Sequence, residues 1–192
     1  FTILQENNVP IMFRPFHEAE GNPSTPSDPI DGSGAWFWWS QDGAEDYKAL
    51  WNYLYDQLTN KYDLHNIIWE NNLYAWSEAS AEWYPGDDCV DIVGWDKYDT
   101  MYNRHDGLTS GPNEDCNSSV YWSLNDYVDN KKMAAITENS TIPSVGNLLT
   151  EKATWLYFCT WYDDQDKFIS GENYNNPDSV KEMYQSDYCI TL

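Results

Sequence analysis

The chain has 192 residues, which is the size of one domain or of a large part of one. Hydrophobic residues make up 41% of it and charged residues only 22%, so the chain can form a core and intrinsic disorder is not expected. With 10 Lys and Arg residues against 32 Asp and Glu residues, the formal net charge is −22, and such a surface repels nucleic acid and anionic lipid.

The first half of the chain contains patterns for a strand, a loop and a helix, followed by two more strands. Apolar, β-rich residues 9–16 predict the first strand, and residues 21–34, rich in Pro, Ser, Asp and Gly, predict a surface loop. Within 44–62, apolar side chains recur at three- and four-residue steps, which indicates an amphipathic helix. Residues 66–70 and 90–95 predict the next two strands.

The second half continues the alternation of strands and helices. Weaker helical patterns cover 126–132 and 144–152, strands are predicted at 134–137 and 155–160, and a last helix with Pro in its first turn is predicted at 177–184. The strand patterns are almost continuously apolar, which is typical of parallel strands buried on both faces. Strand and helix in alternation predict an α/β fold, and five strands fall short of the eight in a (β/α)₈ barrel.

The cysteines, the acids and the apolar runs point to no metal, cofactor or membrane. Cys89, Cys116, Cys159 and Cys189 lack the spacing of a zinc site. One or two disulfides in an exported protein remain open, and three pairings are equally allowed. No apolar run reaches the ~18 residues that span a bilayer, and the acids between 163 and 187 indicate a solvated face without a calcium-loop pattern.

Polar and aromatic side chains gather at the ends of the predicted strands. In an α/β barrel these ends form the active face, so we expect the side chains to converge on one cleft. Aromatic residues make up 17% of the chain, and their flat faces stack on sugar rings, although for any single Trp a place in the core is the commoner role. The strand-end residues are His17, Glu18, Glu70, Asn71, Asn72, Asp96, Tyr98, Glu138 and Trp161.

Glu18 and Glu138 are the pair of carboxyl groups on which a chemical hypothesis depends. Glycosidic bonds are cut by two carboxyl groups, one of which protonates the leaving oxygen while the other attacks the anomeric carbon or activates water. A lone Glu after a strand is more often structural. Here each Glu closes a strongly apolar run and has aromatic sequence nearby, which favours the pair as catalytic residues.

These residues lie in a recognisable string. Residues 9–21, Val-Pro-Ile-Met-Phe-Arg-Pro-Phe-His-Glu-Ala-Glu-Gly, continue at Trp36-Phe37-Trp38-Trp39, and together they resemble the signature of glycoside hydrolase family 26, the β-mannanases. Further similarity follows in order and covers nearly the whole chain, at 64–69, 83–88, 90–98, around Glu138, and at 157–161 and 180–192.

The resemblance implies a (β/α)₈ barrel of retaining hydrolases, with the acid/base on strand 4 and the nucleophile on strand 7. Glu18 would then be the acid/base, His17 its neighbour and Glu138 the nucleophile. The strand count agrees, because three further predicted strands lead from the one before Glu18 to the one before Glu138. Residues 1–192 would be the C-terminal part of a single catalytic domain and supply roughly its last five units.

The same resemblance implies the substrate-binding residues. Tyr98 would orient the nucleophile, Asp96 would lie beneath it, and Trp36 and Trp161 would form sugar-stacking walls. The loop 22–35 lengthens the gap between the motif and the Trp cluster, so the placement of Trp36 follows less directly than that of Glu18. His and Trp residues that the family supplies from its first three strands have no counterpart in this sequence.

Three functions follow from these expectations. The first is a secreted, retaining endo-β-1,4-mannanase that binds β-mannan polymers or oligosaccharides, in a larger modular protein or alone. The second is a family hydrolase of mixed-linkage β-glucan or xylan, and the third is a non-catalytic carbohydrate-binding barrel. Any of them would need the missing N-terminal barrel segment, from the same or a separate chain.

Overall fold

A computed structural model describes residues 1–21, 35, 37–75, 78–98, 108–109, 111–161 and 169–191 of the chain. Two compact units can be distinguished within it. Unit 1 comprises Phe1–Trp95 and Ser123–Met133, and unit 2 comprises Asp96–Trp122 and Ala134–Leu192. Among the described helices, none is long and apolar enough to cross a lipid bilayer.

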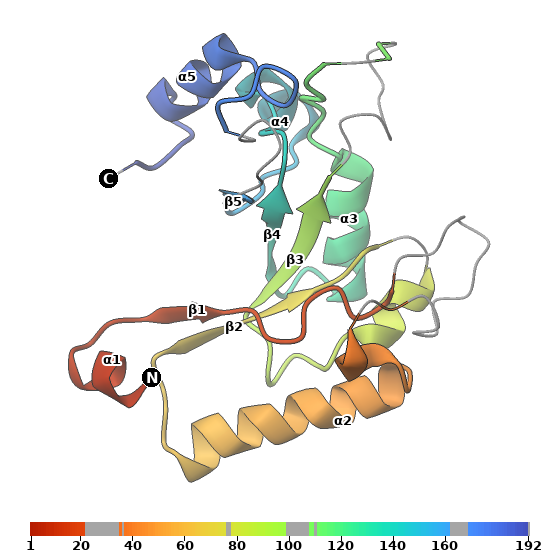
Figure 1. The fold of residues 1–192 in the computed structure, drawn as a ribbon, viewed down its shortest axis with the longest axis vertical. Helices are drawn as coiled ribbons and strands as arrows, with labels where there is room; N and C mark the ends of the chain where they lie inside the picture. Colours follow the sequence, from red (N-terminus) through yellow and green to blue (C-terminus); the bar gives the residue numbers. More distant parts are fainter. Residues whose placement is uncertain are drawn as a thin grey trace. The chain divides into compact units, whose positions relative to one another are not determined.

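Unit 1 is built on parallel strands covered by a long helix (Figure 1). Strand β1 (Ile11–Phe13) pairs in parallel with β2 (Ile67–Asn72), which in turn pairs in parallel with β3 (Ile92–Lys97). The register sets Ile11 beside Ile67 and Asn72 beside Gly94. Parallel pairing carries the polar residues at the end of β2 to the same edge as the loop that follows β1.

Helix α2 (Ala44–Tyr55) covers the strands of unit 1 through large aromatic side chains. Tyr47 and Trp51 are fully buried on its inner face, and the Trp51 indole N–H donates to the carbonyl of Cys89 at 3.2 Å. The Trp51 ring lies 5.9 Å from that of Trp69 on β2. Shorter elements complete the unit and are α1 (Thr2–Glu6), η1 (Trp38–Ser40), the π-helical turn η2 (Asp56–Lys61) and η3 (Glu78–Trp83).

Unit 2 contains the end of β3 and the last two strands. Strand β4 (Met133–Asn139) is buried along nearly its whole length and pairs in parallel with β5 (Phe158–Thr160). Helix α4 (Val145–Glu151) begins at Ser144, whose hydroxyl accepts the Asn147 N–H, and α5 (Pro177–Gln185) begins at Asn176, which accepts the Asp178 N–H. Both are ordinary side-chain caps of helix N-termini.

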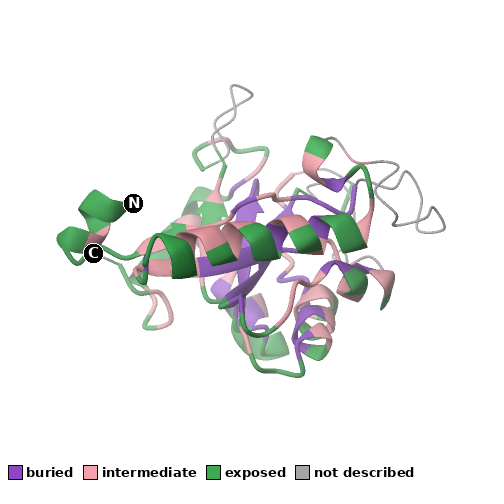
Figure 2. Cartoon of the chain, turned by 90° about the horizontal axis from the view of Figure 1, so that it is seen from below, coloured by how far each residue is buried: buried purple, intermediate pink, exposed green. Residues whose placement is uncertain are grey.

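The strands follow one another in the sheet in the order β1-β2-β3-β4-β5, with α3 (Ser118–Tyr127) between β3 and β4 along the chain. Sequential parallel strands joined through helices are the arrangement of part of a (β/α)₈ barrel, which confirms the expected fold class. Strands β2, β3 and β4 are largely buried, while the outer surfaces of the helices are exposed (Figure 2).

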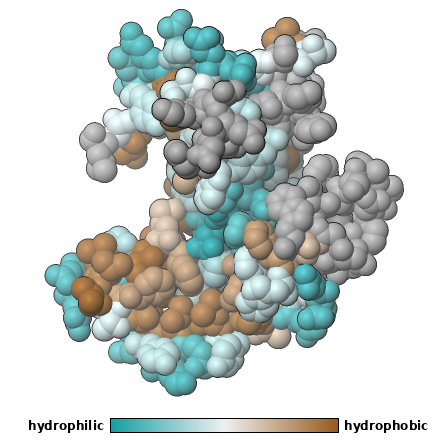
Figure 3. Space-filling view, in the orientation of Figure 1, coloured by the Kyte–Doolittle hydropathy of each residue, from teal (hydrophilic) through white to brown (hydrophobic). Residues whose placement is uncertain are grey.

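Apolar side chains are exposed around α1 and β1 of unit 1 (Figure 3). Ile3, Val9 and Met12 are 73%, 42% and 51% exposed, and Phe1 and Leu4 are exposed beside them. β1 pairs with β2 on one side only among the described strands. An exposed apolar strand edge of this kind invites pairing with another segment.

The structure corrects several predicted boundaries. Helix 126–132 was expected too late, because the helix is Ser118–Tyr127, where Leu124 and Asn125 are its buried residues and Asp129 and Asn130 already adopt positive φ. Helix 44–62 is α-helical only to Tyr55. The first strand is three residues long instead of eight, since Pro10 and Pro15 cannot donate backbone hydrogen bonds.

Candidate active site

Glu18 lies in the loop after β1, in a strained backbone conformation. Its φ is 52° and that of Phe16 is also 52°, a left-handed region that non-glycine residues rarely adopt. The Glu18 side chain is buried with 9% exposure, and its backbone N–H donates to Oδ1 of Asn72, at the end of β2, at 2.9 Å. Such strain costs on the order of 1–3 kcal/mol per residue and persists only where the surroundings impose it.

His17 is held against an aromatic cluster formed by Phe37 and Trp39. The rings of Phe37 and Trp39 stack with centroids 4.3 Å apart and 10° between their planes. The His17 ring lies 4.8 Å from Phe37 and 5.7 Å from Trp39, and the Trp39 indole N–H donates to the His17 carbonyl at 3.0 Å. Phe37 and Trp39 are thereby packed against His17, the residue that precedes Glu18.

Glu20 is a second buried acid in the same loop, and it reaches the loop after β2. Its Oε1 accepts the Tyr74 N–H at 2.7 Å and its Oε2 lies 2.5 Å from the Ser80 hydroxyl, which donates to it. Burial raises the pKa of Glu20 to about 8, although the hydrogen bonds from Ser80 and Tyr74 favour the charged form. Near neutral pH the carboxyl group is therefore mostly protonated.

Unit 2 brings three of the expected site residues together. Glu138 is 5% exposed near the end of β4, and the Tyr98 hydroxyl donates to its Oε2 at 2.7 Å. Asp96, at the buried end of β3, accepts the Thr137 hydroxyl at 2.7 Å, and carboxylate oxygens of Asp96 and Glu138 lie within 4.8 Å of each other. Tyr98 thus contacts Glu138 directly, as a residue that orients Glu138 would, and Asp96 lies close to the same carboxylate.

The two tryptophans named from the sequence differ in what the structure describes. Trp161 follows β5, is 51% exposed and donates its backbone N–H to the carbonyl of Asn139 at 3.1 Å. The Trp161 side chain therefore lies at the surface, and its backbone is bound to Asn139, the residue after Glu138. Trp36 lies outside the described residues, whereas its neighbour Phe37 is described in the aromatic cluster above.

The chain matches the family model of glycosyl hydrolase family 26 over residues 1–192. It belongs to glycosyl hydrolase family 26. A mannan endo-1,4-beta-mannosidase of Thermothelomyces thermophilus is 36% identical over 98% of the chain, and mannan endo-1,4-beta-mannosidase B of Piromyces sp is 30% identical over 94%. The chain covers 32% and 26% of these two proteins.

Solved structures of the family agree with the fold. A ruminal GH26 endo-beta-1,4-mannanase is 56% identical with a TM-score of 0.89, and the match covers 99% of this chain and 38% of that one. The Podospora anserina GH26-CBM35 beta-(1,4)-mannanase is 35% identical with a TM-score of 0.77 over 99% and 35% of the two chains. The chain thus spans about a third of the length of these family 26 relatives.

Several residues that build the site were not singled out from the sequence. Asn72 was grouped with other strand-end polar residues but given no role, and only its position beside the Glu18 loop reveals one. Trp39 and Phe37 lay in the quoted motif, so the motif itself was their signal. Glu20 also lies in the quoted motif, although no role is assigned to it there, and Thr137 carries no signal because one Thr in an apolar strand is unremarkable.

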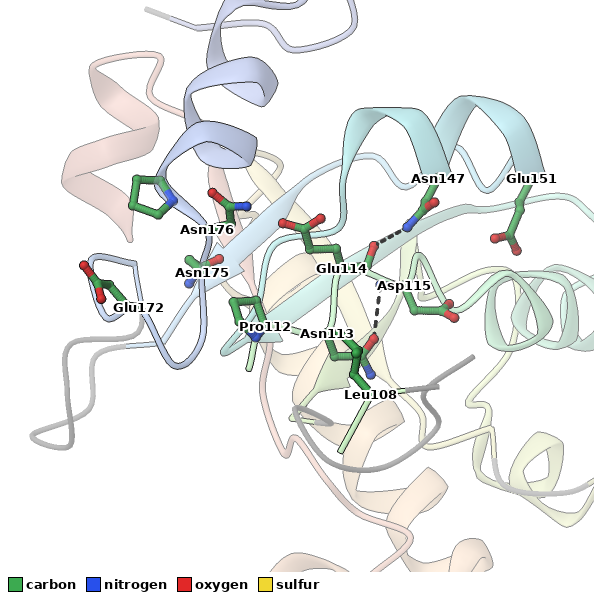
Figure 4. A pocket seen from close by; sticks show the side chains of 11 residues that line it. Leu108, Pro112, Asn113, Glu114, Asp115, Asn147, Glu151, Glu172, Asn175 and Asn176 are labelled. Atoms are coloured by element: carbon green, nitrogen blue, oxygen red, sulfur yellow. Dashed lines mark hydrogen bonds between the residues drawn. The ribbon is translucent and has the colours of Figure 1, made fainter. Parts of the chain in front are cut away.

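A separate cavity in unit 2 is lined by acidic side chains (Figure 4). It has a volume of about 700 Å³, and Glu114, Asp115, Glu151 and Glu172 line it together with asparagines. The Asn147 amide donates to the Glu114 carbonyl at 2.8 Å, which ties the segment before α3 to α4. Glu138 is not among the lining residues, so this cavity is distinct from the group around Tyr98.

One group beside this cavity has the composition of a metal site but already has internal partners. Asp115, Cys116 and Glu151 offer atoms within 4.8 Å of one another. Asp115 accepts the Asn117 N–H at 2.6 Å, and Glu151 accepts the Ser118 hydroxyl. Burial raises the pKa of the Cys116 thiol to about 12, so the thiolate that a metal requires is disfavoured.

The cysteines form no disulfide with one another. All four lie in the described part of the chain as free thiols, with Cys89 and Cys116 buried and Cys159 exposed. The disulfides that the sequence left open are therefore absent among these four residues.

Proposed function

We propose that the protein containing this chain is a retaining endo-β-1,4-mannanase that cleaves mannan, galactomannan or glucomannan by double displacement. Glu18 is the acid/base and Glu138 the nucleophile. The observation that carries the proposal is the Tyr98–Glu138 hydrogen bond: a buried carboxylate at a strand end, oriented by a phenol, suits a group that must attack a carbon atom along one direction.

The reaction has two steps with balanced proton transfers. In the first, a Glu138 carboxylate oxygen attacks the anomeric carbon while the protonated Glu18 gives its proton to the leaving oxygen, which departs as the hydroxyl of the released sugar. In the second, Glu18 takes a proton from water, whose oxygen attacks the anomeric carbon and releases Glu138 as a carboxylate. The anomeric configuration is retained because the carbon is inverted twice.

The remaining site residues bind the sugar chain. Trp161 is half-exposed and offers a flat face for stacking, and Trp36 is proposed as a second wall. His17, fixed by its aromatic neighbours, and Asp96 are proposed to hydrogen-bond sugar hydroxyls. No cofactor or metal is required, since carboxyl groups alone supply the acid, base and nucleophile.

The active protein is proposed to need a further barrel segment, in the same or a separate chain. The exposed apolar residues around β1, Val9 and Met12 among them, support this, because they suit burial against a neighbouring strand and helix. We also propose that the protein acts outside the cell, where polymeric mannan is found, and that residues 1–192 belong to one catalytic domain with that segment.

Hydrolysis of a set of polysaccharides tests the proposal. The full-length protein is expected to release oligosaccharides from β-mannan and galactomannan, with little or no release from mixed-linkage β-glucan or xylan. Glu138→Gln keeps the size of the side chain and its hydrogen-bonding capacity but removes the nucleophile, and activity should fall by about 10³-fold or more. Higher activity on β-glucan or xylan would favour the second hypothesis, and binding without hydrolysis would favour the third.

A further inference from the structure

Among the described residues, four hydrogen bonds at three positions hold the loop that carries Glu18 against other segments of unit 1. The Glu18 N–H binds Asn72, the His17 carbonyl binds the Trp39 indole, and the Glu20 carboxyl group binds both Tyr74 and Ser80. The first two act next to Glu18. The third ties the far side of the loop to the segment after β2, and it alone depends on a side chain that is itself an acid.

Glu20 is an unusual choice for a purely structural tether. Its side chain is 1% exposed, and burying a carboxyl group is costly, whereas the neutral amide of Gln could accept the Tyr74 N–H and donate to the Ser80 oxygen without a charge to bury. Two phenols face it, Tyr47 on α2 and Tyr127 on α3, and burial raises the pKa of both, so they remain neutral. No cation neutralises Glu20 among the partners that the structure describes for it.

The backbone between β1 and Glu20 explains what such a tether does. Phe16 and Glu18 both occupy the left-handed region, and the chain must be forced into it on either side of His17. Asn72 holds the Glu18 amide from one side, and Glu20 closes the turn from the other through Tyr74 and Ser80. The direction of the Glu18 side chain follows from this enforced turn.

We propose that Glu20 is a positioning residue for the general acid: by binding the Tyr74 N–H and the Ser80 hydroxyl it locks the Glu18 loop in the orientation from which Glu18 protonates the leaving group. The proposal rests on the proposed function, since it concerns the acid of that reaction. Glu20 does not contact the substrate in this role, and it acts only through the placement of Glu18.

Two substrates separate positioning of the acid from general damage. Cleavage of mannan needs a proton on the leaving oxygen. In a dinitrophenyl β-mannobioside the leaving group is dinitrophenolate, a weak base that departs without protonation. In the full-length protein, Glu20→Ala is expected to lower kcat/KM on mannan by about tenfold or more while changing kcat/KM on the dinitrophenyl substrate less than about threefold. The comparison is insensitive to partial unfolding, which lowers both rates equally.

Glu20→Gln is the matched control variant. Burial keeps the Glu20 carboxyl mostly protonated near neutral pH, so Gln reproduces its shape and its neutral state. The Gln oxygen can accept the Tyr74 N–H, and its N–H can donate to the Ser80 oxygen when the Ser80 hydroxyl, which donates to Glu20 in the wild type, rotates to accept. Glu20→Gln is expected to restore mannan hydrolysis to within about threefold of the wild type. Should Glu20→Ala fail to fold, Ser80→Ala removes one of the two bonds and should show a smaller loss with the same dependence on the leaving group.

Each outcome decides between the claims. A selective loss on mannan, reversed by Gln, supports the positioning role. Equal losses on both substrates, or no loss on mannan, overturn the positioning role while the wild-type activity upholds the proposed function. A wild-type protein that is inert toward both substrates refutes the proposed function and the positioning role together.

Discussion

The buried carboxyl group of Glu20 makes the free energy of unfolding depend on pH in a way that one substitution can isolate. Its pKa is about 8 in the folded chain against an ordinary value of 4.5. Because the folded state holds the proton more tightly, this group's contribution to stability is complete below about pH 4.5 and is lost as the pH rises toward 8.

The size of this effect follows from the two pKa values. One pKa unit corresponds to about 1.4 kcal/mol, so between pH 5 and pH 9 Glu20 should lower the free energy of unfolding by about 4 kcal/mol. Glu20→Gln has no proton to lose and should escape this decrease. The stability difference between Glu20→Gln and the wild type should therefore shift by about 4 kcal/mol in favour of the variant across this range.

Urea unfolding of the full-length protein at pH values from 5 to 9 measures the difference. Urea carries no charge, so it leaves electrostatic interactions unscreened. Glu182→Gln is the matched control, because it makes the same chemical change on an exposed side chain of α5, and its curve should run parallel to the wild type. Parallel curves for Glu20→Gln and the wild type would refute the inference that burial raises the pKa of the Glu20 carboxyl group.

Three further predictions concern neighbouring contacts. Tyr98→Phe removes the 2.7 Å bond to Glu138, so kcat on mannan should fall about tenfold or more with KM little changed, and a wild-type kcat would remove Tyr98 from the mechanism. Trp161→Ala should lower mannan turnover at least about tenfold, since a lost aromatic platform costs ~1 kcal/mol or more; an unchanged rate in a folded variant would mean that no sugar stacks there. Trp39→Phe keeps an aromatic ring but loses the bond to His17, so unfolding in urea should cost about 1 kcal/mol less, and unchanged stability would mean that stacking alone holds His17.

The strands of the fold were predictable because burial on both faces leaves a plain trace in the sequence. Residues 66–70, 90–95 and 134–137 were read as strands from continuous apolar runs, and β2, β3 and β4 contain or overlap all three. Their ends extend further than predicted, since Asn71, Asp96 and Glu138 are polar yet still belong to the ladders. The apolar residues of each strand end before the site residues begin, whereas the strand itself continues through those polar residues.

The helices were harder to place where apolar periodicity was weak. In helix α3 polar residues interrupt the apolar ones, and Leu124 and Asn125 are its buried residues, so the apolar pattern is irregular and the prediction lies several residues too late. Helix α2, with buried Tyr47 and Trp51, begins at the predicted residue 44 and ends at Tyr55, before the predicted end at 62. Periodicity locates a helix only in proportion to the apolar surface that the helix buries.

The site residues divide in the same way. Glu138 and Tyr98 followed from a motif and from the chemistry of glycosidic bonds, and their contact is direct. Asn72 binds the Glu18 N–H from 54 residues along the chain, and Glu20, in the same loop as Glu18, binds Tyr74 and Ser80 at separations of 54 and 60 residues. Such contacts depend on how β1 and β2 align, and no local pattern in the sequence encodes that alignment.

The nucleophile can be identified directly by trapping it. An activated 2-deoxy-2-fluoro-β-mannobioside forms a glycosyl-enzyme ester that hydrolyses slowly, and mass spectrometry of the digested full-length protein locates the labelled residue. The label is expected on the peptide that contains Glu138 and should be absent from Glu138→Ala. A label on any other carboxyl group, or an active enzyme that forms no ester and releases the inverted anomer, would contradict the assignment of Glu138 as the nucleophile of a double displacement.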